Sequence, residues 1–526
     1  MAAPTAARQF KVTYTSADAD MAAFHRLFDE ALARARAAAG GEHPLFIDHR
    51  PVESPTEHLV DTSPIDTSIV LGRFAAATVK HVDQAVQSAR AAQKAWARTP
   101  WRDRVTVLRR AAELIRDRKF DIGAVMSLEV GKSRMEAMGD AEESADLIDY
   151  YCSQVEEHSG FVRPLGRLSP NERTSDVLRP YGVFACVAPF NFPMALSTGM
   201  SSAALAAGNA VIYKPSRDAP WTGLELYRVY RDAGLPAGLF NFLTGEGPTI
   251  GEALWKHPGV DGIVFTGSKA VGMRMFREFS RDWPKPVLME LGGKNPAVVC
   301  DGADIEMATE GIVKSAFGLQ GQKCSACSRV YADRRIYDAL LEALIARTAG
   351  ITIGDPTEQD VFFGPVINAN AVRTFEEAVA SVGREGSVLC GGRRLTDGSL
   401  ARGHYVAPTI AQLPLEHELF RRELFVPFLS VAPVSGLDQA IEESNRAEYG
   451  LTAGIFSARP EEIERFFDHI EAGVCYANRR SGATTGAWPG VQSFTGWKGS
   501  GSTGKGGCGP YYVAQFMREQ SRTVME

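Results

Sequence analysis

The spacing of apolar residues changes along this chain and divides it into regions. Up to about residue 156 most of the chain has helical spacing, with two short runs that are typical of strands. Helices are predicted at 18–39, 82–98, 102–118, 119–130 and 133–156, and strands at 45–48 and 69–71. The segment 163–179 is rich in Pro, Gly and charge, so we expect it to cross between modules.

From residue 182 onward, short apolar runs alternate with helical stretches. The predicted strands are 183–188, 210–214, 240–243, 262–265 and 287–291, and the predicted helices between them are 194–207, 221–233, 249–256 and 270–279. This alternation predicts a parallel sheet covered by helices, which is the usual setting for a dinucleotide. A second α/β stretch runs from 296 to about 474. We therefore expect an α/β protein with a Rossmann-type cofactor domain and a further α/β domain.

The composition fits a globular protein with more than one domain. The chain has 526 residues, of which 45% are hydrophobic and 23% are charged, as in ordinary folded proteins. A net charge of -6 and the lack of a basic run argue against nucleic acid as a partner. No apolar stretch reaches about 18 residues, so we expect no membrane span.

The start of the chain and its cysteines bear on the compartment. The first residues, Met-Ala-Ala-Pro-Thr-Ala-Ala-Arg, lack the apolar core of a secretory signal. The eight cysteines are scattered without the spacing of a disulfide scaffold, so we expect reduced thiols. These features favour the cytoplasm. The mitochondrial matrix stays open as an alternative, because the first residues are Ala-rich with one early Arg.

Three standard motifs are present only in part. The run Gly504-Lys505-Gly506 resembles the end of a phosphate-binding loop, but its last Gly replaces the hydroxyl residue that holds magnesium. Gly245 and Gly247 begin a dinucleotide fingerprint that has one residue too many. Cys324 and Cys327 form a C-x-x-C pair without a second pair or a His pair, so we expect no metal site. Whether oxidation can join these two sulfurs is left open.

Five other motifs stand at or near the ends of predicted strands. In chain order they are Pro189-Phe190-Asn191-Phe192-Pro193, Lys214-Pro215-Ser216, Phe265-Thr266-Gly267-Ser268, Met289-Glu290-Leu291-Gly292-Gly293-Lys294 and Gly321-Gln322-Lys323-Cys324. Together they resemble the aldehyde dehydrogenase superfamily, from about residue 45 to the C-terminus. The resemblance implies a cofactor domain with an N-terminal helical extension (1–160 and 181–292), a catalytic domain (293–495), and an oligomerisation arm with its tail (161–180 and 496–526).

The oxidation of an aldehyde explains why three of these residues belong together. A carbonyl gives up hydride only after a nucleophile has made it tetrahedral, and the thiolate of Cys324 is the predicted nucleophile. Glu290 is the predicted general base. The resemblance implies that the side-chain amide of Asn191 and the backbone N–H of Cys324 hold the oxyanion. Hydride transfer to a nicotinamide cofactor would leave a thioester on Cys324, which water activated by Glu290 would hydrolyse.

The resemblance also implies where a nicotinamide cofactor binds. Ser268, at the start of a helix, suits the pyrophosphate, and Lys214 suits the adenosine ribose. Glu423 and Phe425 suit the nicotinamide ribose, although residues beside them depart from the family pattern. The expected cofactor residues are Pro189, Phe190, Lys214, Ser216, Arg217, Gly247, Thr266, Gly267, Ser268, Gly272, Leu291, Glu423 and Phe425.

The residues around Cys324 indicate a carboxylated aldehyde. The runs 318–329, 485–487 with 490–492, and 507–511 resemble the branch of the family that oxidises L-glutamate γ-semialdehyde, the open form of 1-pyrroline-5-carboxylate, in proline degradation. By this resemblance the α-carboxylate is held by Ser325 and two backbone amides, and the α-ammonium group faces Glu143. The expected substrate residues are Glu143, Phe192, Ser325, Gly486, Ala487 and Phe494.

Two alternatives to this function stay open. The loop after Asn478 is longer than in that branch, and residues next to Phe494 are replaced. Another short carboxylated aldehyde, such as succinate semialdehyde, is therefore the alternative substrate. A catalytically silent family member is the other alternative, which the presence of Cys324, Glu290 and Asn191 disfavours.

The C-terminal tail predicts a homo-oligomer. Residues 511–526 end in a strand of alternating apolar and polar residues with nothing after it to pair with. In the family such a tail joins the arm at 163–179 and adds to a neighbouring subunit's sheet, which covers an exposed edge. We expect a dimer or a larger assembly formed through this tail.

Arg217 makes the choice between NAD and NADP testable. The family often has Glu there, and a carboxylate would repel a 2′-phosphate, whereas an arginine can pair with one. We nevertheless expect NAD to be preferred, with NADP as the alternative, because the branch that the sequence resembles mostly uses NAD. Measuring kcat/KM with each cofactor checks this. A value about a hundredfold lower with NADP would show that Arg217 does not pair usefully with the phosphate.

Overall fold

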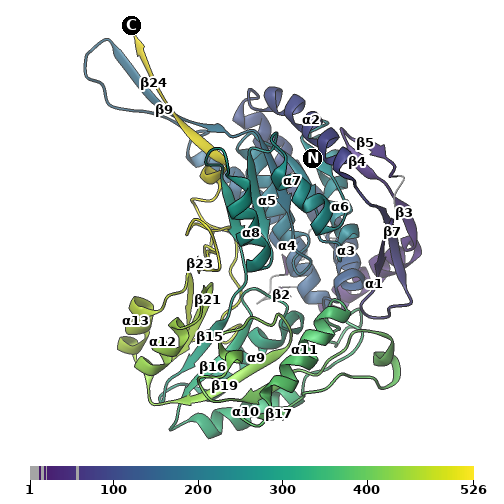
Figure 1. The fold of residues 1–526 in the computed structure, drawn as a ribbon, viewed down its shortest axis with the longest axis vertical. Coiled ribbons are helices and arrows are strands. Elements are labelled where there is room, and N and C mark those ends of the chain that lie inside the picture. The colour runs from purple at the N-terminus through teal and green to yellow at the C-terminus, as the bar shows by residue number, and fades with distance from the viewer. Residues whose placement is uncertain (1–10, 13–16, 19, 55–57) are drawn as a thin grey trace.

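The computed structural model describes residues 11–12, 17–18, 20–54 and 58–526, and these form two lobes and a projecting arm (Figure 1). Each lobe is built on a seven-stranded sheet. The first lobe runs from purple to teal in Figure 1, and the second lobe is mostly green. The N-terminal leader considered above lies outside the described residues.

The first sheet contains the five strands predicted after residue 182. They are β10 (Val183–Val187), β11 (Ala210–Lys214), β12 (Phe240–Phe242), β13 (Gly262–Thr266) and β14 (Val287–Glu290), and they lie parallel in the order β14-β13-β10-β11-β12. The short strands β4 (Leu45–Ile47) and β5 (Arg50–Val52) extend the sheet in the antiparallel sense. Nearly all residues of the parallel strands are buried, as in a sheet covered on both faces. The predicted Rossmann-type sheet is therefore confirmed.

The helices predicted between these strands are present. They are α5 (Ala195–Ala206), α6 (Pro220–Asp232), α7 (Glu252–Lys256) and α8 (Lys269–Phe279), accompanied by α2 (Val79–Trp96). The predicted N-terminal helix is α1 (Met21–Ala38), which Asp20 caps by accepting hydrogen bonds from the backbone N–H groups of Ala22 and Ala23. The helix predicted at 249–256 starts differently, because Gly247–Gly251 forms a π-helical turn.

The prediction of two helices at 102–118 and 119–130 is wrong. One helix, α3 (Trp101–Val130), covers both and packs against α4 (Arg134–Glu157). Lys119, where the second helix was expected to begin, is only 1% exposed. Its ammonium group lies 2.5 Å from the carboxylate of Glu142. This buried ion pair stabilises the charged ammonium group away from water, so Lys119 can lie inside one continuous helix.

The second sheet confirms the α/β stretch predicted from residue 296. Its strands are β15 (Asn295–Val299), β16 (Cys327–Asp333), β17 (Ser387–Cys390), β18 (Thr409–Gln412), β19 (Phe428–Val434), β21 (Thr452–Phe456) and β22 (Val474–Ala477), in the order β17-β18-β19-β16-β15-β21-β22. Only β17 is antiparallel to its neighbour. The helices of this lobe are α9 (Ile305–Phe317), α10 (Tyr337–Ala349), α11 (Ala369–Val382), α12 (Leu437–Asn445) and α13 (Pro460–His469).

The arm is a three-stranded sheet that includes the C-terminal tail. Its central strand β9 (Glu172–Pro180) pairs antiparallel with β8 (Val162–Pro164) and with β24 (Met517–Met525). Figure 1 shows the arm pointing away from both lobes, with the C-terminus at its tip. The segment expected to cross between modules is therefore largely strand, and the tail joins it as predicted.

Small sheets complete the fold. One contains β3 (Gly41–His43), β7 (Val70–Ala75) and β6 (His58–Thr62), another contains β20 (Tyr449–Gly450) and β23 (Trp497–Lys498), and a third contains β1 (Lys11–Val12) and β2 (Ala17–Asp18). Among the described residues, no helix is both long enough and apolar enough to cross a membrane. The same part of the chain contains no group of three His, Cys, Asp or Glu side chains that could hold a metal ion.

Removing the lysine of the buried Lys119–Glu142 pair is expected to destabilise the first lobe. Lys119→Met leaves the Glu142 carboxylate, 3% exposed, without this ammonium group, and breaking a buried pair costs about 3–5 kcal/mol. Thermal denaturation should show a clearly lower midpoint. The double variant Lys119→Met/Glu142→Leu removes both charges and should recover most of the loss. A double variant no more stable than the single one would mean that lost packing is responsible.

Candidate active site

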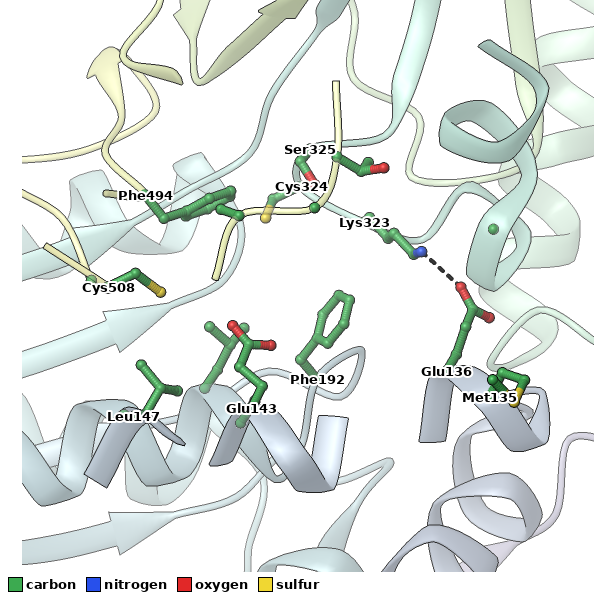
Figure 2. A pocket seen from close by; sticks show the side chains of 18 of the residues that line it. Met135, Glu136, Glu143, Leu147, Phe192, Lys323, Cys324, Ser325, Phe494 and Cys508 are labelled. Carbon is green, nitrogen blue, oxygen red and sulfur yellow. Dashed lines mark hydrogen bonds and ion pairs between the residues drawn. The ribbon is translucent and has the colours of Figure 1, made fainter. Parts of the chain in front are cut away.

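The two lobes meet at one cavity. β14 ends at Glu290 and β15 begins at Asn295, so the chain crosses from the first sheet to the second within residues 291–294. The loop between α9 and β16 carries Cys324. The cavity has a volume of about 490 Å³, and Figure 2 shows Cys324 on one side of it and α4 on the other.

Most of the predicted catalytic and substrate residues line this cavity. They come from α4, from strand ends of the first sheet, from the loop before β16 and from the segment after β22. The predicted residues in the lining are Glu143, Phe192, Thr266, Glu290, Cys324, Ser325, Gly486, Ala487 and Phe494. The fold therefore brings together all the residues predicted to touch the substrate, from segments far apart in the sequence.

The loop before Cys324 has an unusual backbone conformation. Leu319, Gln320 and Gly321 have φ angles of 46°, 54° and 69°, in the left-handed region. For Leu and Gln this conformation costs energy that surrounding contacts must offset. The side-chain amide of Asn295 donates to the carbonyl oxygen of Cys324 at 2.7 Å. The backbone of the predicted nucleophile is thereby fixed, while its side chain faces the cavity (Figure 2).

Asn191 lies behind the lining and contacts the same loop. It is 2% exposed, and its amide nitrogen donates to the carbonyl oxygen of Gln322 at 2.9 Å. Gln322 is itself held, because its side-chain oxygen accepts from the backbone N–H of Ile367 at 2.9 Å. A side-chain amide nitrogen carries two protons. One proton of Asn191 orients the side chain beside the nucleophile loop, and its role toward an oxyanion stays a prediction.

Cys324 holds its proton at neutral pH in the free protein, and burial disfavours the charged form of Glu290. Withdrawal from water, followed by the charges of Glu290 and Glu423, raises the pKa of Cys324 to about 12. Withdrawal from water also raises the pKa of Glu290 well above its usual value. The oxygen Oε2 of Glu290 is buried and has no hydrogen-bond partner among the described residues. This oxygen is therefore available to exchange a proton with a molecule in the cavity.

A buried ion pair supports the predicted aromatic wall. The ammonium group of Lys132 lies 3.8 Å from the ring centroid of Phe192. It also pairs with the carboxylate of Asp140 at 2.6 Å, and both side chains are fully buried. Asp140 in turn accepts from the backbone N–H of Ala195 at 2.6 Å, at the start of α5. The ring expected to flank the substrate is thus fixed from behind.

The predicted carboxylate anchor is joined to the nucleophile loop. Gly486 has a φ of 109°, a conformation that favours glycine, and its carbonyl oxygen accepts from Arg479 at 2.8 Å. The hydroxyl of Thr484 donates to the carbonyl oxygen of Ser325 at 2.6 Å. Thr484 therefore links the segment that carries Gly486 to the loop that carries Ser325, the two segments expected to lie on either side of a bound carboxylate.

The predicted cofactor residues of the first lobe lie along the carboxyl edge of its sheet. Pro189 and Phe190 follow β10, Lys214, Ser216 and Arg217 lie at the end of β11, Gly247 follows β12, Thr266, Gly267, Ser268 and Gly272 lie at or after the end of β13, and Leu291 follows β14. Dinucleotides bind at such an edge. Ser268 caps α8, so the positive end of that helix faces the edge. Burial lowers the pKa of Lys214 to about 8, and Arg217 pairs with Glu246 at 2.7 Å.

Glu423 and Phe425 come from the second lobe and meet this edge. Glu423 accepts from the backbone N–H of Gly293 at 2.9 Å, and burial raises its pKa to about 7. Phe425 has a φ of 60°, and its ring meets that of Phe190 edge to face, with centroids 5.9 Å apart. The two residues predicted from the second lobe therefore lie beside those predicted from the first.

Known proteins match this chain over nearly its whole length. The sequence pattern of the aldehyde dehydrogenase family matches residues 52–521. The chain belongs to this family. The 1-pyrroline-5-carboxylate dehydrogenase of Anoxybacillus flavithermus is 35% identical over 507 residues, which are 95% of this chain and 96% of that protein. The 1-pyrroline-5-carboxylate dehydrogenase 2 of Bacillus subtilis is 35% identical over 505 residues, 95% of this chain and 96% of its own.

A solved structure confirms the expected fold of this aldehyde dehydrogenase. The 1-pyrroline-5-carboxylate dehydrogenase from Thermus, solved with bound NAD, is similar with a TM-score of 0.91 at 34% identity. The match covers 97% of each chain. The predicted family and fold class are therefore both confirmed.

Several cavity residues of this aldehyde dehydrogenase are missing from the sequence prediction. Lys323 pairs with Glu136 at 2.7 Å, and the two lie at one side of the cavity in Figure 2. Cys508 lies at the other side, and its backbone N–H donates to the hydroxyl of Tyr151 at 3.1 Å. Lys323 directly precedes the predicted nucleophile, so its position in the sequence could have identified it as a cavity residue. Cys508 and Tyr151 are 357 positions apart, and no local pattern connects them.

Cys327 lies in the core of the second lobe rather than in the cavity lining. It is 1% exposed, and its sulfur donates to the carbonyl oxygen of Arg329 at 3.6 Å. All eight cysteines are free thiols. A redox pairing of Cys327 with Cys324 stays a prediction.

Alkylation of Cys324 by iodoacetamide is expected to accelerate steadily with pH. Only the thiolate reacts, and with a pKa of about 12 its fraction grows about tenfold per pH unit between about pH 7 and pH 9. Mass spectrometry of the peptide that contains Cys324 measures the rate, with Cys324→Ser as the blank. A rate that levels off within this range would contradict the raised pKa.

Proposed function

We propose that this chain oxidises L-glutamate γ-semialdehyde, formed from 1-pyrroline-5-carboxylate, to L-glutamate, the second step of proline degradation. The observation that carries the proposal is one cavity lined by Cys324, Glu290 and all the residues predicted to bind this substrate. Relatives named for this activity match the chain over nearly its whole length, which supports the choice. A volume of about 490 Å³ suits a small ligand.

The cavity offers a partner for each charge of this substrate. The α-carboxylate is assigned to Ser325 and the backbone amides of Gly486 and Ala487, because close backbone approach suits a carboxylate. The α-ammonium group is assigned to Glu143, which projects from α4 into the cavity (Figure 2). The aliphatic middle lies between the rings of Phe192 and Phe494. This assignment leaves neither charge buried without a partner.

The first chemical step belongs to the sulfur of Cys324. The sulfur attacks the aldehyde carbon and forms a C–S bond, and the carbonyl oxygen becomes an oxyanion. The second amide proton of Asn191 and the backbone N–H of Cys324 stabilise that oxyanion, and loss of one such donor costs about 2.7–4 kcal/mol. The bound nicotinamide cofactor supplies the acceptor for the hydride, and a thioester remains on Cys324.

Glu290 accepts the protons that the thiol and the water release during the reaction. It takes the thiol proton before the attack, releases that proton to solvent, and then takes a second proton from the water that hydrolyses the thioester. Because burial raises its pKa, the carboxylate form of Glu290 that can accept a proton is favoured as pH rises. The reaction should therefore become faster as pH rises.

NAD is the proposed cofactor, with NADP as the alternative. A buried ammonium group at the sheet edge favours a dinucleotide there. The ammonium group of Lys214, at the end of β11, is buried and bonds to the carbonyl of Pro215 at 3.1 Å. Lys214 is assigned to the adenosine ribose, Ser268 to the pyrophosphate and Glu423 to the nicotinamide ribose.

The domain division and the assembly belong to the same proposal. Residues 1–160 with 181–292 form the cofactor domain, 293–495 the catalytic domain, and 161–180 with 496–526 the arm and its tail. The two large sheets and the arm sheet support this division. Nearly all residues of β24 are exposed in the single chain, which supports a homo-oligomer, a dimer or larger, that covers this strand. The location proposed for the enzyme is the cytoplasm.

NADH formation from 1-pyrroline-5-carboxylate, followed by absorbance, tests the function. We expect turnover by the wild type and none by Cys324→Ala, because the nucleophile is lost. Asn191→Ala should lower kcat by about 10²–10³, the cost of one oxyanion donor. Cys390→Ala, a thiol outside the cavity lining, is the matched control and should keep full activity.

A second substrate separates the remaining candidates. Succinate semialdehyde with a kcat/KM equal to or above that of 1-pyrroline-5-carboxylate would favour the other carboxylated aldehyde. A folded wild type without turnover of either aldehyde, with NAD or NADP, would favour a catalytically silent family member.

A further inference from the structure

We propose that a hydrogen bond between Trp488 and Asp146 fixes the anchor loop (residues 481–490) on helix α4 and thereby sets the affinity for aldehydes that carry a carboxylate. The proposal rests on the proposed function, because this loop contains Gly486 and Ala487, assigned above to the α-carboxylate. Neither Trp488 nor Asp146 belongs to the cavity lining among the described residues. Both are therefore positioning residues.

The contact is a charge-assisted hydrogen bond with a fixed acceptor. Nε1 of Trp488 donates to Oδ2 of Asp146 at 2.9 Å. Arg116 lies 2.9 Å from the other oxygen of this carboxylate, and Lys11 lies 3.0 Å from Oδ2. Burial alone would raise the pKa of Asp146, but these hydrogen bonds outweigh it and lower the pKa. Asp146 therefore stays charged, and its three donors hold it in one orientation.

A second contact docks the loop one helical turn further along α4. Gly490 has a φ of +71°, and a Cβ there would lie 3.0 Å from the ring of Tyr150. Tyr150 follows Asp146 by four positions, so both lie on the same face of the helix. The anchor loop is thus held against α4 at two neighbouring turns, just after the residues assigned to the carboxylate.

The geometry of α4 connects this docking to the substrate. Glu143, assigned to the α-ammonium group, precedes Asp146 by three positions and lies on the same side of the helix. One helix therefore carries both the partner of the positive charge and the support of the loop that receives the negative charge. The Trp488–Asp146 bond sets the separation between the two binding points, which must match the distance between the two charges on one carbon atom.

Loss of this bond should act on binding rather than on chemistry. Cys324, Asn191 and Glu290 stand on other segments of the chain, and the Thr484–Ser325 hydrogen bond that joins the loop to the nucleophile does not involve Trp488 or Asp146, so the attack on the aldehyde keeps its geometry. Without this bond the loop binds the carboxylate less tightly in both the ground state and the transition state. KM therefore rises while kcat stays unchanged. An aldehyde without a carboxylate does not use the loop and should be unaffected.

Two variants and two aldehydes test the proposal in the full-length enzyme. Trp488→Phe keeps an aromatic side chain and removes the indole N–H. We expect its KM for 1-pyrroline-5-carboxylate to rise about tenfold with kcat within about twofold, while kcat/KM for propionaldehyde stays unchanged. Asp146→Asn keeps an acceptor oxygen but loses its charge, so a smaller rise in KM is expected. Trp283→Phe, at a 60% exposed position outside the cavity lining, is the matched control.

Each result separates this proposal from the proposed function. An unchanged KM in Trp488→Phe, or an equal loss with both aldehydes, overturns the positioning role. A fall in kcat together with a lower thermal midpoint assigns Trp488 to stability and also overturns it. A wild type that does not oxidise 1-pyrroline-5-carboxylate refutes the proposed function instead. The same variants are then compared on succinate semialdehyde, whose KM must rise in Trp488→Phe if the loop binds carboxylates.

Discussion

Residues 291–294 join the last strand of the first sheet to the first strand of the second, and this short link forces the two lobes together. A Cβ on Gly293 would clash with the backbone carbonyl oxygen of Cys324, so this position has to lack a side chain. A Cβ on Gly292 would meet the carboxylate of Glu423, whose flexible side chain would have to move. Burial of the groups beside this link raises the pKa of both Cys324 and Glu290.

Helix α4 organises the rest of the cavity. Near its start Glu136 pairs with Lys323, the residue before the predicted nucleophile. Its middle provides the cavity residue Glu143, and further along the hydroxyl of Tyr151 accepts from the backbone of the C-terminal segment. Segments from distant parts of the sequence thus take their positions from one rigid element. Substitutions on α4 can therefore alter the site without touching the reacting atoms.

Local patterns were enough to predict the five parallel strands of the first sheet, and short motifs were enough to propose the candidate catalytic residues. A parallel strand buried on both faces leaves a continuous apolar run, and β11 matches its prediction at both ends. Cys324, Glu290 and Asn191 each stand in a short motif at or near a strand end, where a fold of this kind collects functional groups. These residues could be selected without knowing what lies across the cavity.

Residues whose environment comes from a distant segment could not be predicted in this way. From the sequence alone Lys119 is expected to be exposed, because its partner Glu142 lies on another helix. Trp488 and Asp146 are 342 positions apart, and neither lies in a motif. The shape of the cavity and its supporting contacts depend on such long-range partners, so the sequence indicated the reacting groups better than their supports.

The arm has a consequence for the order of folding during synthesis. β9 is made early, but most of its hydrogen-bonding partners lie in β24, more than three hundred positions later in the chain. The two lobes can therefore fold around their own sheets while one edge of β9 is still unpaired. Contacts of such long sequence separation form slowly, and the open edge is exposed to wrong pairing until the tail arrives. Closure of the arm thus cannot precede the synthesis and release of β24.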